Sequence, residues 1–329
     1  MQLNHESFED LIGAYALDAC DEEEVAAVEA YVAGNPDACI EVERLRAAAA
    51  WIGAAGTATP PPDLRASLLA RAATTVVAAD GVDAYTELTD TFADDLEALA
   101  PDAVEVVTHN GLTIRELVAH LAAIDEVFVE ELTAAAPARP FIDATSVIDI
   151  TREALDRAGN KPFAELFREW RATRGKLRDA AAASPDRHVM GYSVSDALVI
   201  RAFETWTHLD DVRRTTARET YVPRPAVVRS MADLSMRVVP YALAVNGMAR
   251  PGESMKFVLT GPGGGSWDVP LAPGEHPADD PATVVTVDVI DWCNRFADRL
   301  EPDALSMHVE GDRAAATDVV LAAPAFTGL

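Results

Sequence analysis

The sequence predicts a mainly α-helical protein that ends in a small α+β domain. Apolar residues recur at helical spacing through the N-terminal two thirds of the chain. The segment TATPPP interrupts this pattern at 57–62, and short strand-like stretches alternate with helices in the last third. A chain of 329 residues is also too long for one typical core. We therefore expect a helical module at 1–75, a helical bundle at 76–218 and an α+β domain at 219–329.

The N-terminal module is expected to contain four short helices. The first runs through SFEDLIGAYALDA, and Asp21 begins the second, with Glu24 at the partner position of a capping box. Gly34-Asn35-Pro36 ends the second helix. The third covers DACIEVERLRAAAAWIGAA, and DLRASLLARA forms the fourth after the proline linker. Four such helices bury little area, so we expect them to complete their core against a partner or another domain.

The middle segment has the pattern of an antiparallel four-helix bundle, because its helices are long and its loops are modest. Thr113 and Glu116 form a second capping box, and Ser193 precedes the last helix. The expected helices are DAYTELTDTFADDLEAL, TIRELVAHLAAIDEVFVEELTAAA, KPFAELFREWRATRGKLRDAAAA and VSDALVIRAFETWTHLDDVRRT.

The last third begins with a helix through AVVRSMADLSMRVVPYALAV and then changes to a mixed pattern. The expected strands are MKFVLTG, SWDVPL, TVVTVDV and SMHVEG, and the expected helices are DVIDWCNRFADRL and DRAAATDVVLAA. The segment GPGGGS at 261–266 lacks the lysine of a phosphate-binding loop and precedes a strand. It is therefore predicted to be a hairpin turn.

Charge and composition restrict the class of partner. The formal net charge is −27, which argues against direct binding to nucleic acid, because phosphate attraction dominates non-specific binding. An acidic surface suits a basic protein partner. A salt-loving or high-GC bacterial ancestry would also give an acidic, alanine-rich chain. No run of roughly eighteen apolar residues indicates a membrane span, and the acidic N-terminus does not resemble a signal peptide. We therefore expect a cytoplasmic protein.

The cysteines agree with a reducing compartment. Cys20, Cys39 and Cys293 form no C-x-x-C motif and no disulfide framework. Cys20 and Cys39 both lie in the N-terminal helices and could pair, but two small buried side chains are the simpler interpretation.

The candidate site lies on two helices of the bundle. Arg201, Glu204, His208 and Asp211 share one face of the last helix, and His120 lies on the apolar stripe of the second helix. Taken singly, a histidine on such a stripe is a hydrogen-bonded core residue, and Glu and His one turn apart are a surface pair. Together, two imidazoles and one carboxylate make a zinc site with one open position, which can carry a water or a thiolate.

The neighbours of these ligands have two readings each. Arg201 could hold an acidic group of a substrate, which would make it a catalytic-site residue, or it could be a structural partner of Glu204. Asp211 could orient His208 or be solvated at the helix end, and we expect Asp210 to be solvated.

Two motifs of the bundle resemble a known family. THNGLTIRELVAHLAA followed downstream by RAFETWTHLDDV resembles the mycothiol-dependent maleylpyruvate isomerase family, which belongs to the DinB-like bundles. The zinc ligands of that family match His120, Glu204 and His208. FVLTGPGGGSWDVPL and MHVEGDRAAATDVVL resemble the α/β appendage of the family, so that the likeness covers 76–329. The resemblance implies zinc and a low-molecular-weight thiol, mycothiol, without naming the electrophile.

The N-terminal module resembles the anti-sigma domain of bacterial sigma-factor regulators, through LIGAYALDACDEEEVAAVEAYVAGNPDACIEVERLR and PPPDLRASLLARA. The zinc knuckle of that domain is replaced by Tyr31, Asn35 and Ala38, and Cys39 is one residue out of register. The resemblance therefore implies a zinc-free version that binds a sigma factor through residues 1–73.

Two functions follow from these observations. The first is a cytoplasmic anti-sigma-like transcriptional regulator with a zinc-binding, mycothiol-linked bundle that senses or transfers a thiol. The alternative is a mycothiol-dependent zinc enzyme, a thiol S-transferase or isomerase, whose N-terminal helices are only structural. The sequence leaves open whether turnover occurs.

Overall fold

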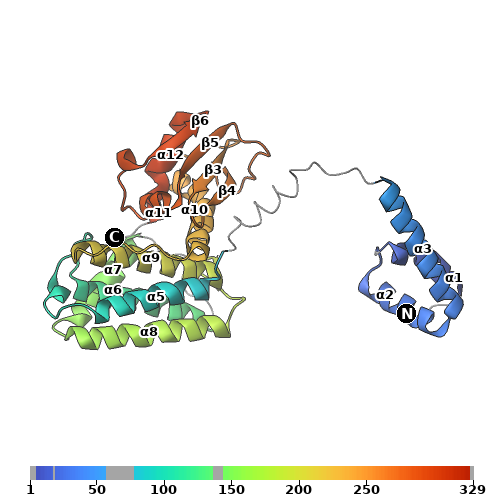
Figure 1. The fold of residues 1–329 in the computed structure, drawn as a ribbon. Coiled ribbons are helices and arrows are strands. Elements are labelled where there is room, and N and C mark those ends of the chain that lie inside the picture. Colours follow the sequence, from blue (N-terminus) through green and yellow to red (C-terminus); the bar gives the residue numbers. More distant parts are fainter. Residues whose placement is uncertain (1–4, 18, 57–77, 136–143, 327–329) are drawn as a thin grey trace. The chain divides into compact units, whose positions relative to one another are not determined.

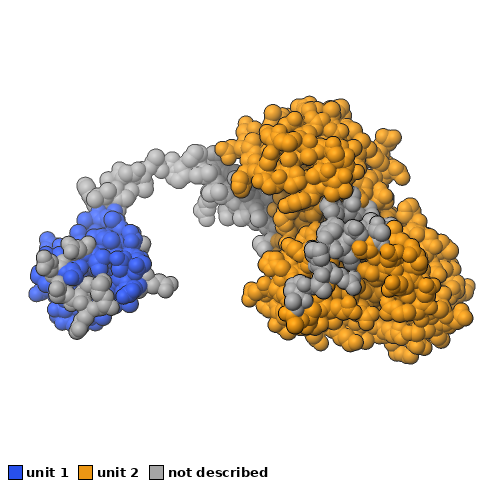
Figure 2. Space-filling model, turned by 180° about the vertical axis from the view of Figure 1, so that it is seen from behind, with its two compact units in different colours: residues 1–72 blue, residues 73–329 orange. Residues whose placement is uncertain are grey.

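The computed structural model describes residues 5–17, 19–56, 78–135 and 144–326. The chain divides into two compact units, Met1–Ala72 and Ala73–Leu329 (Figure 2). The second unit contains both the helical bundle and the α+β part, and the boundary expected near residue 218 stays a prediction. Among the described residues, no helix is long and apolar enough to cross a membrane.

The first unit is built from three described helices, α1 (His5–Ala16), α2 (Glu22–Gly34) and α3 (Pro36–Gly56). The predicted capping box at the start of α2 is confirmed, because Asp21 and Glu24 exchange side-chain and backbone hydrogen bonds. A small core holds the helices together and consists of Phe8, Ile12, Val28, Ala38 and Val42. The fourth helix predicted at 63–72 lies outside the described residues.

Two of the residues compared above with a zinc knuckle, Tyr31 and Asn35, make a ring contact and a backbone contact. The ring of Tyr31 stacks on Phe8 with 4.7 Å between ring centroids. The Asn35 side-chain amide donates to the backbone oxygen of Tyr31 at 2.7 Å, between the end of α2 and the start of α3. Cys20 and Cys39 are both free thiols, and the expectation that both are buried was wrong, because Cys39 is exposed and Cys20 is only partly buried.

The bundle consists of long helices that pack side by side (Figure 1). Helix α5 packs mainly on α9, and α6 packs on both α7 and α8. The bounds are α5 (Gly81–Glu97), α6 (Ile114–Thr133), α7 (Ala144–Ala158), α8 (Phe163–Ala183) and α9 (Val194–Thr215). The capping box of Thr113 and Glu116 begins α6 as predicted, and Ser193 caps α9 by accepting from the Asp196 N–H at 3.1 Å.

The structure contains a helix, α7, that the predicted four-helix bundle lacks, so this prediction was incomplete. The segment ATSVIDITREALDRA is polar on most of its surface, with a narrow stripe of inward residues at helical spacing. Val147, Ile150, Thr151, Ala154, Leu155 and Ala158 form this stripe. A pattern so narrow is easily taken for a loop, although its period is that of a helix.

Helices α5 and α9 come close together where Gly81 of α5 meets Ser195 of α9. The Gly81 N–H donates to the Ser195 hydroxyl at 2.9 Å, and a Cβ on Gly81 would lie 2.1 Å from the Ser195 backbone oxygen. Just before this contact, β1 (His188–Val189) and β2 (Tyr192–Ser193) form a short hairpin. Its turn residues Met190 and Gly191 both have positive φ, 52° and 84°, as a type I′ turn requires.

The C-terminal part contains four strands and helices, as predicted, and the strands form one sheet. The strands lie in the order β4-β3-β5-β6, with β3 and β5 parallel and the other pairs antiparallel. Alternate residues of β3 and β5 are buried, which is the face that the helices cover. The elements are α10 (Pro225–Val245), β3 (Ser254–Thr260), β4 (Gly265–Pro270), β5 (Thr283–Asp288), α11 (Val289–Phe296), β6 (Met307–Glu310) and α12 (Arg313–Ala322), with short 3-10 turns at Ala103–Glu105, Pro302–Ala304 and Ala323–Phe326.

The bundle and the sheet share one hydrophobic core. Its buried residues come from α5, α6, α8, α9, α10, α11 and α12 and from the strands β1, β3, β4 and β5. Phe203 of α9 stacks on Phe296 of α11 with 5.7 Å between ring centroids. The segment 261–264 is the turn of the β3–β4 hairpin, with positive φ at Gly261 and Gly263, so the hairpin prediction is confirmed. This shared core brings the end of α11 close to α9.

Candidate metal centre

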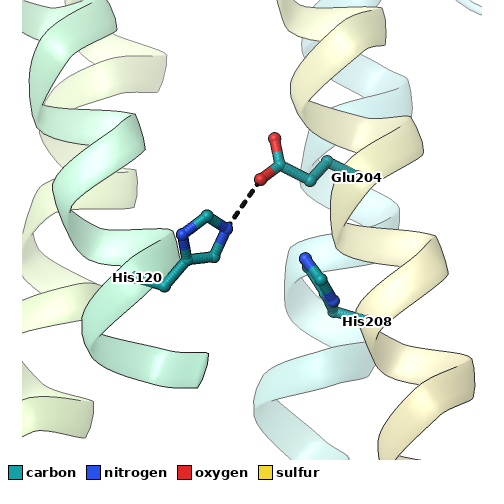
Figure 3. Close-up of side chains that lie close together, drawn as sticks. All are labelled: His120, Glu204 and His208. Atoms are coloured by element: carbon teal, nitrogen blue, oxygen red, sulfur yellow. Dashed lines mark hydrogen bonds and ion pairs between the residues drawn. The ribbon is translucent and has the colours of Figure 1, made fainter. Parts of the chain in front are cut away.

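Three side chains converge between α6 and α9 (Figure 3). His120 comes from α6, and Glu204 and His208 lie one turn apart on α9. One donor atom from each residue lies within 4.8 Å of the other two. His120 Nε2 is 2.9 Å from Glu204 Oε1, and the two imidazole rings are 5.5 Å apart at 85°. The residues predicted from the sequence as metal ligands are therefore close together in space.

The two histidines are inside the protein, while the carboxylate has some access to solvent. His120 and His208 are 0% and 2% exposed, and the side chain of Glu204 is 27% exposed. Burial lowers the pKa of His120 and outweighs the effect of the nearby Glu204 carboxylate. At neutral pH His120 is therefore a neutral imidazole with one bare nitrogen.

The position of that bare nitrogen follows from Thr151 on α7. The Thr151 hydroxyl donates its hydrogen to the Val147 backbone oxygen at 2.7 Å. Its oxygen therefore accepts from His120 Nδ1–H, at 2.8 Å. The Nε2 lone pair of His120 then faces the carboxylate of Glu204, and two lone pairs at that distance repel unless a cation lies beside both. This contact fits a metal ion.

The outer nitrogen of His208 has a charged partner. His208 Nδ1 lies 3.2 Å from Asp211 Oδ2, and because a carboxylate can only accept, Nδ1 carries the hydrogen. Burial alone would raise the pKa of Asp211, but hydrogen bonds from His208 and Arg299 outweigh burial and lower it. Asp211 is therefore ionised and orients His208, with Nε2 left free for the site.

Arg201 lies buried behind Glu204. Its Nε donates to Asp125 Oδ1 at 2.8 Å, and its Nη1 forms an ion pair with Glu204. Tyr85 donates to the other oxygen of Asp125 at 2.6 Å. Burial disfavours the charge on Arg201, but Glu204 and Asp125 outweigh it and raise the pKa of Arg201.

The same ion pair keeps the ligand carboxylate charged. Burial would raise the pKa of Glu204, but the neighbouring charge of Arg201 outweighs burial and lowers it well below its ordinary value. The predicted structural pairing of Arg201 and Glu204 is thus present. The role of Arg201 toward an acidic substrate stays a prediction. Its Nη2 has no hydrogen-bond partner within the described part of the chain and is the atom through which it would act.

The donor set fits zinc. Two imidazole nitrogens and one ionised carboxylate oxygen are the ligand types of zinc sites that keep a fourth position open. Each histidine also has an outer hydrogen-bond partner that fixes its ring, as metal-binding histidines generally do.

Sequence reasoning missed two contacts of the site and misjudged one neighbour. Thr151 lies on the unrecognised α7, and Arg299 is far from the motif in sequence, so no local pattern could indicate it. The expectation that Asp210 is solvated was wrong. Asp210 is 3% exposed and accepts from the Tyr221 N–H at 2.7 Å, because the segment after α9 folds back over the helix end.

Comparisons with known proteins place the chain among relatives. Residues 85–213 match the family described as the mycothiol maleylpyruvate isomerase N-terminal domain. Two uncharacterized proteins of Mycobacterium tuberculosis, from strains CDC 1551 / Oshkosh and ATCC 25618 / H37Rv, are each 30% identical over 253 residues. These alignments cover 68% of this chain and 91% of each relative.

Two solved structures are also similar to this chain. They are the crystal structures of the mycothiol-dependent maleylpyruvate isomerase and of a histidine-to-alanine mutant of it, with TM-scores of 0.47 and 0.48 and 14% identity. Each covers 69% of this chain and 91% of its own. On the sequence relatives and the family match, this chain belongs to the family that carries the mycothiol maleylpyruvate isomerase N-terminal domain.

Proposed function

We propose that this protein is a zinc enzyme that depends on a low-molecular-weight thiol, mycothiol. The enzyme would either transfer this thiol to an electrophilic substrate or use the thiol to isomerise that substrate. The observation that carries the proposal is the convergence of His120, Glu204 and His208 in a chain of this family. The family match supports the enzyme alternative, and none of these comparisons supports the anti-sigma resemblance.

The residues of the site would divide the work. His120 and His208 would offer their Nε2 lone pairs, and Glu204 would offer a carboxylate oxygen. When bound, zinc supplies a positive charge that lowers the pKa of a thiol at the open position. Arg201 keeps Glu204 ionised, and its free Nη2 would receive an acidic group of the electrophile. The buried histidines exclude water from one side of the site, which strengthens these electrostatic contacts.

The metal is tested first. Elemental analysis of the purified protein is expected to give one zinc per chain. His120→Ala and His208→Ala should each lose the metal, because two protein ligands hold zinc poorly. His308→Ala is the matched control, since His308 pairs with Glu310 on the exposed face of the sheet. Full zinc occupancy in both ligand variants would rule the site out.

The thiol is tested on the zinc-loaded protein. Titration calorimetry is expected to show mycothiol binding to the wild-type chain and to His308→Ala. Neither His120→Ala nor His208→Ala should bind it. If the zinc-loaded wild type gives no binding heat with mycothiol, the thiol-dependent function is wrong even though the metal site stands.

A second candidate function concerns the first unit, which is compact by itself. Leu17 and Ile40 are 67% and 56% exposed, and such a small core leaves apolar surface available for a partner. We propose sigma-factor binding through residues 1–73, steered by acidic side chains and slowed by salt. The full chain should capture a sigma factor, and Val28→Asp in the core of the unit should abolish capture. Equal capture by both chains would contradict this role.

A further inference from the structure

The metal site is connected to the C-terminal α+β part through one buried arginine. Arg299 Nε and Nη2 donate to the two oxygens of Asp211, each at 2.8 Å. Asp211 in turn accepts from His208 Nδ1. The side chains of Arg299 and Asp211 are 5% and 0% exposed. A two-point contact between a guanidinium and a carboxylate fixes the plane of both groups, which a single hydrogen bond cannot do.

The backbone holds Arg299 in place. Helix α11 is followed by its cap residue Ala297 and then by Asp298, which has a positive φ of 57°. The Asp298 N–H then donates to Arg295 O at 3.1 Å and the Arg299 N–H donates to Asn294 O at 2.7 Å, the hydrogen-bond pattern of a Schellman motif. Arg299 Nη1 also donates to Ala297 O at 3.2 Å. The guanidinium is therefore fixed by its own helix end before it reaches Asp211.

The two histidines of the site differ in this respect. The outer partner of His120 is the neutral hydroxyl of Thr151, which belongs to the bundle. The outer partner of His208 is a charged carboxylate whose orientation depends on an arginine outside the bundle. A carboxylate behind a metal-binding imidazole fixes its ring and increases its basicity, and loss of such a partner typically weakens metal affinity about 10- to 100-fold.

We propose that Arg299 is a positioning residue of the metal centre, through which the C-terminal α+β part sets the affinity of the bundle for zinc. The inference rests on the proposed metal function. Arg299 contacts neither the metal nor a substrate. It holds the Asp211 carboxylate, and Asp211 holds the His208 ring with Nε2 directed into the site. The last third of the chain is then part of the metal-binding machinery.

The test compares zinc affinities by competition with a chromophoric chelator in the full-length protein. Arg299→Gln is expected to weaken zinc binding about 10- to 100-fold. Arg299→Lys keeps the charge but not the two-point contact, so an intermediate loss is expected. Arg213→Gln is the matched control, because Arg213 makes a similar two-point contact with Asp95, at 2.5 and 3.0 Å, on the same helix as His208. This control should lose stability without losing zinc affinity.

A double-mutant cycle separates positioning from general weakening of the fold. In the Asp211→Asn background, Arg299→Gln should cause no further loss of zinc affinity, because the two residues act through one contact. Additive losses, an equal loss in Arg213→Gln, or wild-type affinity in folded Arg299→Gln would each overturn the inference. If Arg299→Gln does not fold, Arg299→Lys decides by the same criteria. A wild-type chain without zinc would reject the metal function itself, whereas zinc binding that is indifferent to Arg299 rejects only this inference.

Discussion

Two nitrogens of the candidate site are held by different chemistry, one by a hydroxyl and one by a carboxylate. Thr151 accepts a hydrogen bond from His120 Nδ1–H and fixes the orientation of that ring inside the bundle. Asp211 performs the corresponding role for His208 as an ion. Burial disfavours the charged form of His120 and lowers its pKa. Protonation of His120 in acid should therefore destabilise the folded chain.

This difference predicts how the metal-free protein responds to acid. The pKa of His120 is lower in the folded chain than its ordinary value, so the unfolded chain binds a proton first as pH falls. The stability that His120 contributes is therefore complete above about pH 6.5 and is lost as pH falls below it. After removal of metal with a chelator, the urea concentration at the unfolding midpoint should decrease as the pH is lowered from 7 to 5.

The variant His120→Gln keeps a polar side chain without this titration, so its midpoint should fall less over the same interval. His308→Ala, which removes an exposed histidine, should follow the wild type. Parallel curves for the wild type and His120→Gln would show that His120 does not titrate differently in the folded chain.

The three metal-ligand residues could be predicted from the sequence more readily than the residues that hold them in place. His120 was indicated by a histidine on an apolar helical stripe, and Glu204 and His208 by their spacing of one turn. These signals are local, and helix geometry alone converts them into a shared face. Arg299 depends on how α11 packs against α9, so only the folded chain shows that contact.

At the scale of elements, the contact between α5 and α9 depends on a glycine, Gly81, that has no side chain. Alanine normally stabilises a helix relative to glycine by about 0.5–1 kcal/mol. At Gly81 an added Cβ would lie 2.1 Å from the backbone of Ser195, and backbone cannot yield as a side chain can. Gly81→Ala should therefore destabilise the protein by about 1–3 kcal/mol.

Gly175 in the middle of α8 is the control for this substitution, because nothing lies within 4 Å of an added Cβ there. Gly175→Ala should stabilise the protein by about 0.5–1 kcal/mol. Opposite signs in chemical unfolding are the expected result. A stabilising Gly81→Ala would mean that α5 and α9 are further apart than the structure shows.

Most elements were predictable because their residues follow one simple period. Helices α6 and α9 have capping residues and wide apolar faces, β3 alternates buried and less buried residues, and β5 is rich in β-branched residues. Helix α7 has neither a wide apolar face nor a cap formed by a described side chain. Its position follows from packing on α6, which is a tertiary effect that local pattern does not contain.

At the scale of the molecule, the site belongs entirely to the second unit. His120, Glu204, His208 and Arg299 all lie within Ala73–Leu329. A chain that begins at residue 78 should therefore keep its zinc content and its thermal unfolding transition. Differential scanning calorimetry and elemental analysis of this chain and the full-length protein check the expectation. Loss of metal on truncation would mean that the first unit contributes to the site.

The separation of the site residues along the chain also determines when the site can exist during protein synthesis. His120 leaves the ribosome first, and Arg299 follows 179 positions later. At about 5–20 residues per second, this interval lasts roughly 10 to 35 s. His208 and its partner Asp211 are translated within this interval, but the arginine that holds Asp211 is translated only at its end. The nascent chain must therefore protect an incomplete pair of buried histidines until nearly its last helix has been made.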